Sequence, residues 1–173
     1  EAKSRVASLA RLRAQQASLE RLLRELARAA PSRPRADDGT EFGRLRGRLA
    51  WPVAGRVVAN FGDTRASGVD WDGMVVATEH AAPVHAIAAG RVIYADWLPG
   101  LGLLTILDHG GGYLSLYGYN DQLRKSVGEA VGAGDVIAAA GDTGGRSEPE
   151  LYLEIRRGGK PVDPRPWFRQ RKP

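Results

Sequence analysis

The second half of the sequence is built from short apolar runs separated by glycines, and this pattern limits the fold more than any other feature. Six runs follow one another from residue 55 onward: GRVVANFG, GMVVATE, PVHAIAAGRVIYADWL, LLTILDHGGGYLSLYGY, DVIAAAGDTG and ELYLEIRR. Short runs rich in β-branched and apolar residues and bounded by turn residues indicate strands. We therefore expect a mainly β domain over residues 49–170, a small barrel or sandwich of short antiparallel strands.

The first 30 residues have a different character. They contain no glycine or proline and are rich in Ala, Leu, Arg, Glu and Gln, which favour a helix. A 3-4 spacing, typical of a coiled-coil seam, runs through Arg5, Leu9, Leu12, Gln16, Leu19, Leu23 and Leu26. Residues 1–30 are therefore interpreted as the end of a coiled coil or as an arm that docks on another surface. The alternative, that residues 1–30 form a lone amphipathic helix packed on its own domain, remains open.

Residues 31–48 join these two parts. They are rich in Pro, Arg, Asp and Gly and show little apolar periodicity, which predicts a linker. The chain has a formal net charge of +5, and its basic residues lie mainly in residues 1–48 and in the tail from Arg156 to Lys172. Because few aromatic residues accompany them, they favour solvated surface over nucleic-acid binding. An anionic cell wall or lipid surface is the remaining alternative.

Cysteine content and hydropathy further limit the class of protein and the compartment to which the chain could belong. The sequence has no cysteine, which excludes disulfides and thiolate metal ligands. No run approaches the roughly 20 apolar residues of a membrane span. Since the chain begins with Glu1 rather than Met, we expect a processed or trimmed chain, in which a targeting signal would be missing. These features fit a cytosolic or a periplasmic protein.

The run ELYLEIRR, residues 150–157, carries the clearest strand alternation. Leu151, Leu153 and Ile155 fall on one face. The opposite face carries Glu150, Tyr152, Glu154 and Arg156. We expect this second row to point outward from the domain, where it could take part in binding or chemistry.

The order of the runs resembles the LytM-type (lysostaphin-like) zinc endopeptidases over residues 50–168. The resemblance rests on WPVAGRVVANFG, WDGMVVATEHAAPVHAIAAGRV, LDHGGGYLSLYGY, VGAGDVIAAAGDTGG and ELYLEIRRGGKPVDPRPW. Within that family GRVIYADWLPGLG, SLYGYN and LYLEIRR are similar to the EnvC-type activators of cell-wall amidases.

The resemblance also implies that the catalytic positions have been replaced. Active members carry H-x-x-x-D on an early strand, tyrosine–alanine–histidine in the middle and H-x-H on a late strand. In this chain the five positions hold Trp71, Val75, Tyr119, Glu150 and Tyr152. Catalytic zinc needs about three protein ligands, and tryptophan and valine provide none. We therefore expect no bound metal, no other cofactor and no hydrolase activity.

The remaining histidines are His80, His85 and His109. His80 and His85 are five positions apart, an odd separation that places two residues of one strand on opposite faces. His109 lies in the hairpin DHGGGY and is expected to be structural. These three residues do not predict a metal site.

What the resemblance implies is a non-catalytic activator of periplasmic N-acetylmuramoyl-L-alanine amidases in cell separation. The vestigial groove would bind an amidase helix that blocks the amidase's own active site. The expected groove residues are Trp71, Asp72, Val75, Leu101, Leu104, Tyr117, Tyr119, Glu150, Tyr152 and Arg156. Aromatic anchors with an arginine are typical of protein interfaces.

Two alternatives stay open at this point. The helix of residues 1–30 is either an autoinhibitory arm that fills the groove or the extension of a coiled coil that senses a division-site membrane complex (FtsEX-like). The chain could instead be a passive peptidoglycan-binding module, for which small polar residues would be expected in the groove.

Overall fold

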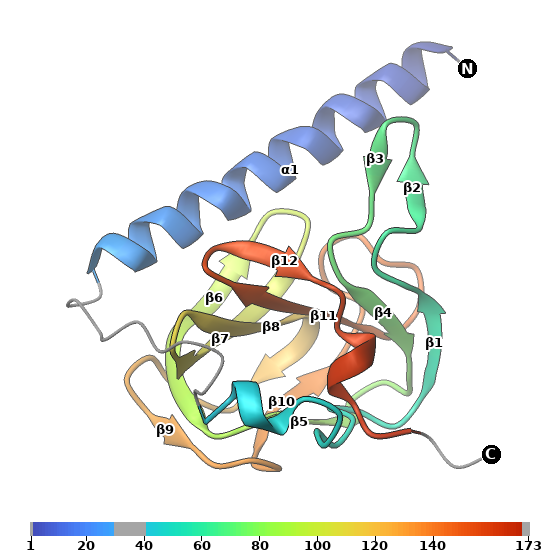
Figure 1. Cartoon of the computed structure of the whole chain (residues 1–173). Coiled ribbons are helices and arrows are strands. Elements are labelled where there is room, and N and C mark those ends of the chain that lie inside the picture. Colours follow the sequence, from blue (N-terminus) through green and yellow to red (C-terminus); the bar gives the residue numbers. More distant parts are fainter. Residues whose placement is uncertain (1, 30–40, 171–173) are drawn as a thin grey trace.

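The computed structural model describes residues 2–29 and 41–170 as one long helix followed by a β domain (Figure 1). The helix is α1 (Ala2–Ala29), and the two short 3-10 helices are η1 (Gly43–Leu45) and η2 (Arg165–Trp167). The strands are β1 (Arg56–Ala59), β2 (Thr64–Ala66), β3 (Val69–Asp70), β4 (Met74–Ala77), β5 (Pro83–His85), β6 (Gly90–Leu98), β7 (Gly102–Gly110), β8 (Tyr113–Leu123), β9 (Ala130–Val131), β10 (Val136–Ala140), β11 (Glu150–Arg157) and β12 (Lys160–Val162). The predicted mainly β, antiparallel fold with a preceding helix is confirmed.

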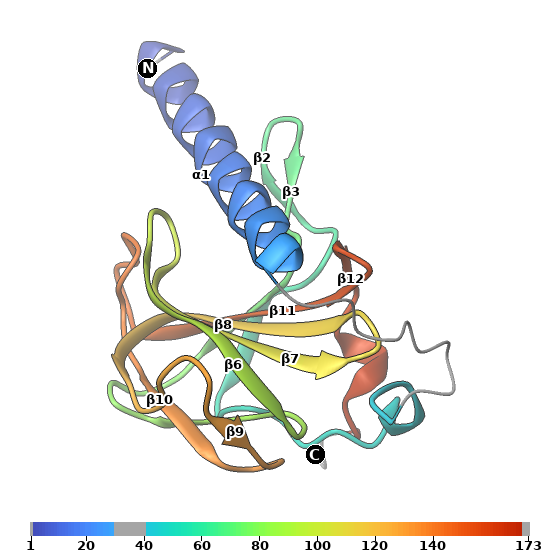
Figure 2. The same ribbon diagram turned by 90° about the vertical axis from the view of Figure 1, so that its left-hand side faces the viewer.

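Ten strands form one sheet, in which seven lie in the order β1-β4-β11-β8-β7-β6-β9. Strand β12 pairs with β11, β10 pairs with β8, and β5 pairs with β10. Strands β2 and β3 form a separate hairpin that stands beside α1 (Figure 2). Strand β11 is central because β4 and β8 flank it, and its bounds coincide with the predicted run ELYLEIRR.

The alternation of strand residues divides the apolar side chains into two buried clusters. The main core contains Leu151, Leu153 and Ile155 of β11 together with Met74 and Val76 of β4. The second cluster, which we call the groove cluster, lies on the opposite face of the same strands. It comprises Leu19, Leu23, Val75, Leu98, Leu101, Leu104, Ile106, Leu116, Tyr119 and Tyr152.

Helix α1 supplies part of the groove cluster. Leu19 and Leu23 are only 6% and 7% exposed, and Leu22 and Leu26 pack against the same cluster. Burying a leucine side chain contributes roughly 1.5–3 kcal/mol, whereas an isolated helix of this kind is marginal in water. The helix is therefore held by the contacts of its leucine face with the sheet, across which it lies in Figure 1.

The turn between β6 and β7 is shaped to receive this helix. Gly100 has a φ of +84°, which favours glycine. A Cβ added there would lie 2.6 Å from the Gln15 side chain of α1. The turn therefore depends on glycine both for its backbone conformation and for the close approach of the helix.

Among the described residues no helix combines the length and apolar character that crossing a membrane requires.

The structure differs from the predicted linker in its last part. Residues 31–40 lie outside the described residues, but residues 41–48 pack on the β domain. Phe42 is 2% exposed, and its ring lies 4.7 Å from those of His109 and Tyr113 and 4.8 Å from that of Trp167. Since Phe42 and Leu45 are isolated apolar residues among polar ones, periodicity gave no sign that this segment packs on the main core.

Candidate functional site

The positions that the resemblance matched to the catalytic residues of the LytM-type enzymes lie together on the groove face of the sheet. Val75 and Tyr152 are directly paired on β4 and β11. The Tyr152 ring is 5.6 Å from that of Tyr119 and 6.0 Å from that of Trp71. Leu101 and Leu104, two further predicted groove residues, belong to the same buried cluster. The site is thus a packed aromatic and aliphatic surface.

A close approach of the chain brings Trp71 and Asp72 to this surface. Gly73, between β3 and β4, has no room for a side chain, because a Cβ would lie 2.3 Å from the Leu153 carbonyl oxygen and 3.0 Å from the Tyr152 ring. Asp72 is half-buried and lines a cavity of about 40 Å³ together with Tyr152, Arg156 and residues of α1.

Tyr119 reaches the groove face because the backbone of β8 is irregular. Its φ of +70° lies in the left-handed region, which is uncommon for a residue other than glycine. Between the pairs Leu103–Asn120 and Thr105–Tyr117, β8 holds one residue more than β7. This bulge reverses the facing of the side chains that follow. The Tyr119 hydroxyl is buried and has no hydrogen-bond partner among the described residues.

Tyr117 was predicted as a groove residue, and this prediction is wrong. It lies in the main core, where its hydroxyl accepts a hydrogen bond from the Ile87 amide and lies 2.8 Å from the Ser115 hydroxyl. Tyr117 and Tyr119 are two positions apart, which would place them on one face of a regular strand. The bulge separates them, and sequence periodicity could not reveal it.

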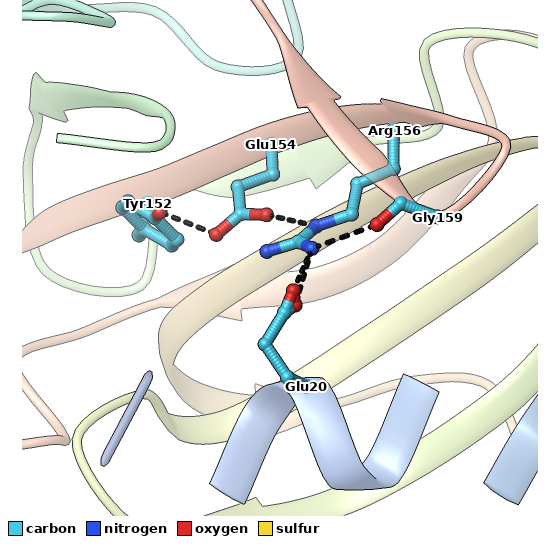
Figure 3. Close-up of polar contacts among 5 residues, drawn as sticks. All are labelled: Glu20, Tyr152, Glu154, Arg156 and Gly159. Atoms are coloured by element: carbon cyan, nitrogen blue, oxygen red, sulfur yellow. Dashed lines mark hydrogen bonds and ion pairs between the residues drawn. The ribbon is translucent and has the colours of Figure 1, made fainter. Parts of the chain in front are cut away.

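The row Tyr152, Glu154 and Arg156 was expected to point outward into solvent. It does lie opposite the main core, but these side chains are 3%, 1% and 1% exposed. The Tyr152 hydroxyl donates to Glu154 Oε2 at 2.5 Å, and Arg156 Nε donates to Glu154 Oε1 at 2.6 Å (Figure 3). The expectation fails because α1 covers this face.

Glu20 of α1 completes the buried polar row. Arg156 Nη1 donates to Glu20 Oε1 at 2.5 Å and to Oε2 at 2.7 Å, and it also contacts the Gly159 carbonyl oxygen at 3.2 Å (Figure 3). Glu20 keeps 40% of its side chain exposed, while Arg156 is buried. Docking of α1 therefore buries leucine side chains, and it also places the Glu20 carboxylate against the buried guanidinium of Arg156.

Burial sets the protonation behaviour of this row. Desolvation raises the pKa of Glu154, although the neighbouring Arg156 acts in the opposite direction. Burial opposes the charged form of Arg156, but the ion pairs with Glu154 and Glu20 outweigh it and raise the pKa. Desolvation also raises the pKa of Asp72 despite Arg156, and Glu20 raises it further. The Glu20 carboxylate is thus attractive to Arg156 and repulsive to Asp72.

Two arginines that sequence reasoning missed flank the aromatic cluster. Arg146 Nε donates to Glu150 Oε1 at 2.7 Å, and its guanidinium lies 5.0 Å from the Tyr119 ring. Arg65 stacks 4.0 Å above the Trp71 ring. Both come from segments without strand periodicity, next to the turns around Gly68 and Gly145, so only the fold brings them to the site.

The residues at these positions do not fit a catalytic zinc ion. Trp71 and Val75 offer no ligand atom, and Glu150, the one carboxylate among the five positions, is engaged by Arg146. Within residues 2–29 and 41–170 no group of three or more His, Cys, Asp or Glu side chains is placed to hold a metal. No catalytic step through a metal can be derived from this arrangement.

The three histidines lie apart from the groove cluster. His85 Nδ1 lies 2.9 Å from the Gly134 carbonyl oxygen, and exposed His80 lies 3.6 Å from Asp121. His109 Nδ1 donates to the Ala89 carbonyl oxygen at 2.7 Å, so its neutral ring accepts from the Ser115 hydroxyl through Nε2. Desolvation lowers the pKa of His109 to about 4. His109 thus ties β7 to β8 and to the segment before β6.

Curated relatives match about seven tenths of this chain. The murein hydrolase activator EnvC of Escherichia coli K12 is 46% identical over 127 residues, which are 73% of this chain and 30% of that protein. The murein hydrolase activator NlpD of the same organism is 38% identical over 122 residues, which are 70% of this chain and 31% of that protein. The chain thus spans about a third of the length of these relatives.

Solved structures show the same fold. A putative peptidase M23 from Pseudomonas aeruginosa superposes with a TM-score of 0.67 at 24% identity, covering 87% of this chain and 60% of that one. The catalytic domain of lysostaphin from Staphylococcus simulans superposes with a TM-score of 0.60 at 24% identity, covering 65% and 91%. The sequence model of Peptidase family M23 matches residues 69–164, more than half of the chain. The chain therefore belongs to Peptidase family M23.

Proposed function

We propose that this protein is a non-catalytic activator of a cell-wall amidase and that it binds the amidase through the groove cluster. The observation that carries the proposal is the replaced site itself. Where a hydrolase would need zinc ligands and histidines for proton transfer, Val75, Tyr119 and Tyr152 form a packed apolar surface beside a buried arginine. Relatives named murein hydrolase activators support the same role, and with it a periplasmic location and a part in cell separation.

The groove cluster suits a helical partner because α1 already occupies it as a helix. Leu19 and Leu23 contribute apolar contacts, and Glu20 provides the carboxylate for Arg156. An amphipathic helix that lays its apolar face into a groove is a recurrent recognition mode. The amidase helix would present two apolar side chains and a carboxylate in a similar arrangement, since displacing Glu20 without replacing it would leave Arg156 with less charge compensation.

Under this proposal α1 is an autoinhibitory arm. A competitor on the same chain acts at an effective concentration that reaches the millimolar range, so the free protein rests with its groove filled. A division-site membrane complex would move the coiled coil to which α1 would belong. This movement would free the groove. The contacts of Glu20 with Arg156 favour this role over a simple extension of a coiled coil, which requires no specific contact with the β domain.

The alternative of a passive peptidoglycan-binding module finds less support in the groove. Large hydrophobic residues stand where small polar ones would be expected along the path of a wall peptide. The buried Tyr152–Glu154–Arg156 row also has its hydrogen bonds satisfied within the protein and by α1.

The test is an activation assay with a purified resting amidase and dye-labelled sacculi. Glu20→Ala removes the contact with Arg156 and should raise dye release above that of the unmodified chain. The matched control is Glu25→Ala, which removes an exposed carboxylate from the same helix and should change nothing. The chain alone should release no dye. Equal activation by both variants would refute the autoinhibitory role of α1. Absence of activation by the unmodified chain and both variants, or lysis by the chain alone, would refute the proposed function.

A further inference from the structure

A second cavity lies beside the N-terminal half of α1. Its volume is about 850 Å³, within the size range of ligand sites. It opens between α1, the β2–β3 hairpin, the turn after β6 and the loop after β10, and Figure 2 shows the hairpin next to the helix. We call this cavity the arginine cleft, after Arg5 and Arg11 of α1 and Arg65 and Arg146 of the β domain.

The cleft carries excess positive charge. Among residues 2–29 and 41–170, no Asp or Glu side chain lines it. Arg146 is paired with Glu150, and Arg65 stacks on Trp71 and interacts electrostatically with Asp72, which does not line the cleft. Within the described part of the chain, no carboxylate is paired with Arg5 or Arg11, which are both exposed. Like charges gathered from two elements repel one another. An anionic ligand bound between α1 and the β domain would relieve this repulsion.

We propose that the arginine cleft binds an acidic peptide and that the bound peptide holds α1 on the groove cluster. The guanidinium fork matches the geometry of a carboxylate. The apolar part of the lining, Leu9, Leu12 and the 52% exposed Trp97, provides contacts for apolar side chains placed between the carboxylates. This combination favours a peptide over a bare inorganic anion, which would use the arginines alone.

The coupling to helix docking follows from the composition of the cleft. Two of its arginines belong to α1 and two to the β domain, so the complete site exists only while the helix is docked. A ligand that binds one of two states shifts the population toward that state. The peptide would therefore oppose release of the arm. Peptide binding in the cleft is separate from the proposed activation of an amidase, and it requires only that α1 is docked.

The experiment uses the full chain without any amidase, so its outcome is independent of amidase activation. The probe is a hexapeptide of alternating glutamate and leucine, titrated by calorimetry at low salt. We expect binding that weakens at least tenfold in the variant Arg5→Ser, Arg11→Ser. The matched control, Arg24→Ser, Arg28→Ser, removes two exposed arginines from the same helix outside the cleft and should bind as the unmodified chain does. Equal losses in both variants would overturn the proposal.

Hydrogen exchange of the α1 amides gives the second readout. The peptide should slow exchange in residues 12–26 of the unmodified chain and not in the Arg5→Ser, Arg11→Ser variant. Unchanged or faster exchange with the peptide bound would refute the coupling. Tripolyphosphate binding as tightly as the peptide would refute the peptide assignment, because the apolar lining would then play no part. Binding to phosphatidylglycerol vesicles without binding to the peptide would assign the cleft to a membrane surface.

Discussion

The two faces of β11 are both buried, but they are buried in different ways. Leu151, Leu153 and Ile155 are covered by the β domain itself and belong to its main core. On the opposite face Tyr152 and Arg156 are covered partly by α1, and a buried carboxylate, Glu154, lies between them. The first face has the character of a core, and the second has the character of a protein–protein interface whose partner belongs to the same chain.

This difference separates the groove cluster from an open catalytic groove. A hydrolytic groove has to stay open to water and substrate, whereas the groove cluster excludes water and retains one arginine with a fixed geometry. Aromatic residues and arginine dominate the energy of such interfaces. The comparison can be tested by variants that affect one face and spare the other.

The largest effect is expected from Arg156→Ala. It leaves Glu154 buried without its cation, which typically costs about 3–5 kcal/mol, so the free energy of unfolding should fall by that amount. The sequence predicted that this row points outward, in which case the substitution would leave the fold intact; the burial of Arg156 changes that expectation. Urea unfolding measures the change. Arg169→Ala, at an exposed arginine, is the control, and an equally small loss in both variants would contradict the description of this face as buried.

Leucine truncations should separate the two faces directly. Leu153→Ala removes a fully buried side chain of the main core and should lower the stability of the β domain by about 3 kcal/mol. Leu23→Ala removes a comparable side chain from α1 and should leave the melting temperature of the β domain nearly unchanged. Hydrogen exchange of the α1 amides should instead become faster in Leu23→Ala. A drop in the melting temperature as large as that of Leu153→Ala would mean that α1 and the β domain unfold as one unit.

Acidification should act on the two faces in opposite directions. Because the pKa of His109 is lowered from 6.5 to about 4, the unfolded chain binds more protons there between these values, and stability is lost as pH falls through that window, by at most about 3 kcal/mol. Glu154 has a raised pKa, so its contribution falls as pH rises above the unfolded value of 4.5. Unfolding free energies between pH 7 and 4 should thus fall less steeply in His109→Gln.

The smallest effect is expected from deletion of residues 1–30. If α1 competes with the amidase helix, the truncated protein should bind the amidase about tenfold more tightly or better, equivalent to about 1.4 kcal/mol or more. Surface plasmon resonance with both proteins at matched concentrations measures the difference. Equal affinities would favour the extension of a coiled coil as the role of α1.

Local periodicity predicted the parts of this protein that depend on neighbouring residues. The alternation in ELYLEIRR gave the bounds of β11 and the separation of Leu153 from Arg156. The 3-4 spacing of leucines gave the helix and the face on which Leu19 and Leu23 lie. The family resemblance added which strand positions meet, and Val75, Tyr119 and Tyr152 do lie together.

Local periodicity failed where a residue's position depends on distant parts of the chain. The facing of Tyr119 rests on a bulge and a positive φ, so Tyr117 was misplaced on the groove face. Phe42 joins the main core from a polar segment, and Arg146 reaches Tyr119 from a glycine-rich loop. None of these features alters the period-two pattern of the neighbouring residues.

The sequence by itself determined which side chains of β11 and α1 share a face, because that follows from the repeat of the backbone within one element. Only the tertiary structure decided what covers each face, because a strand is equally regular whether water, a sheet or a helix lies against it. That is why Tyr152 and Arg156 looked like an exposed row in the sequence and are buried under Glu20 and the leucines of α1 in the fold.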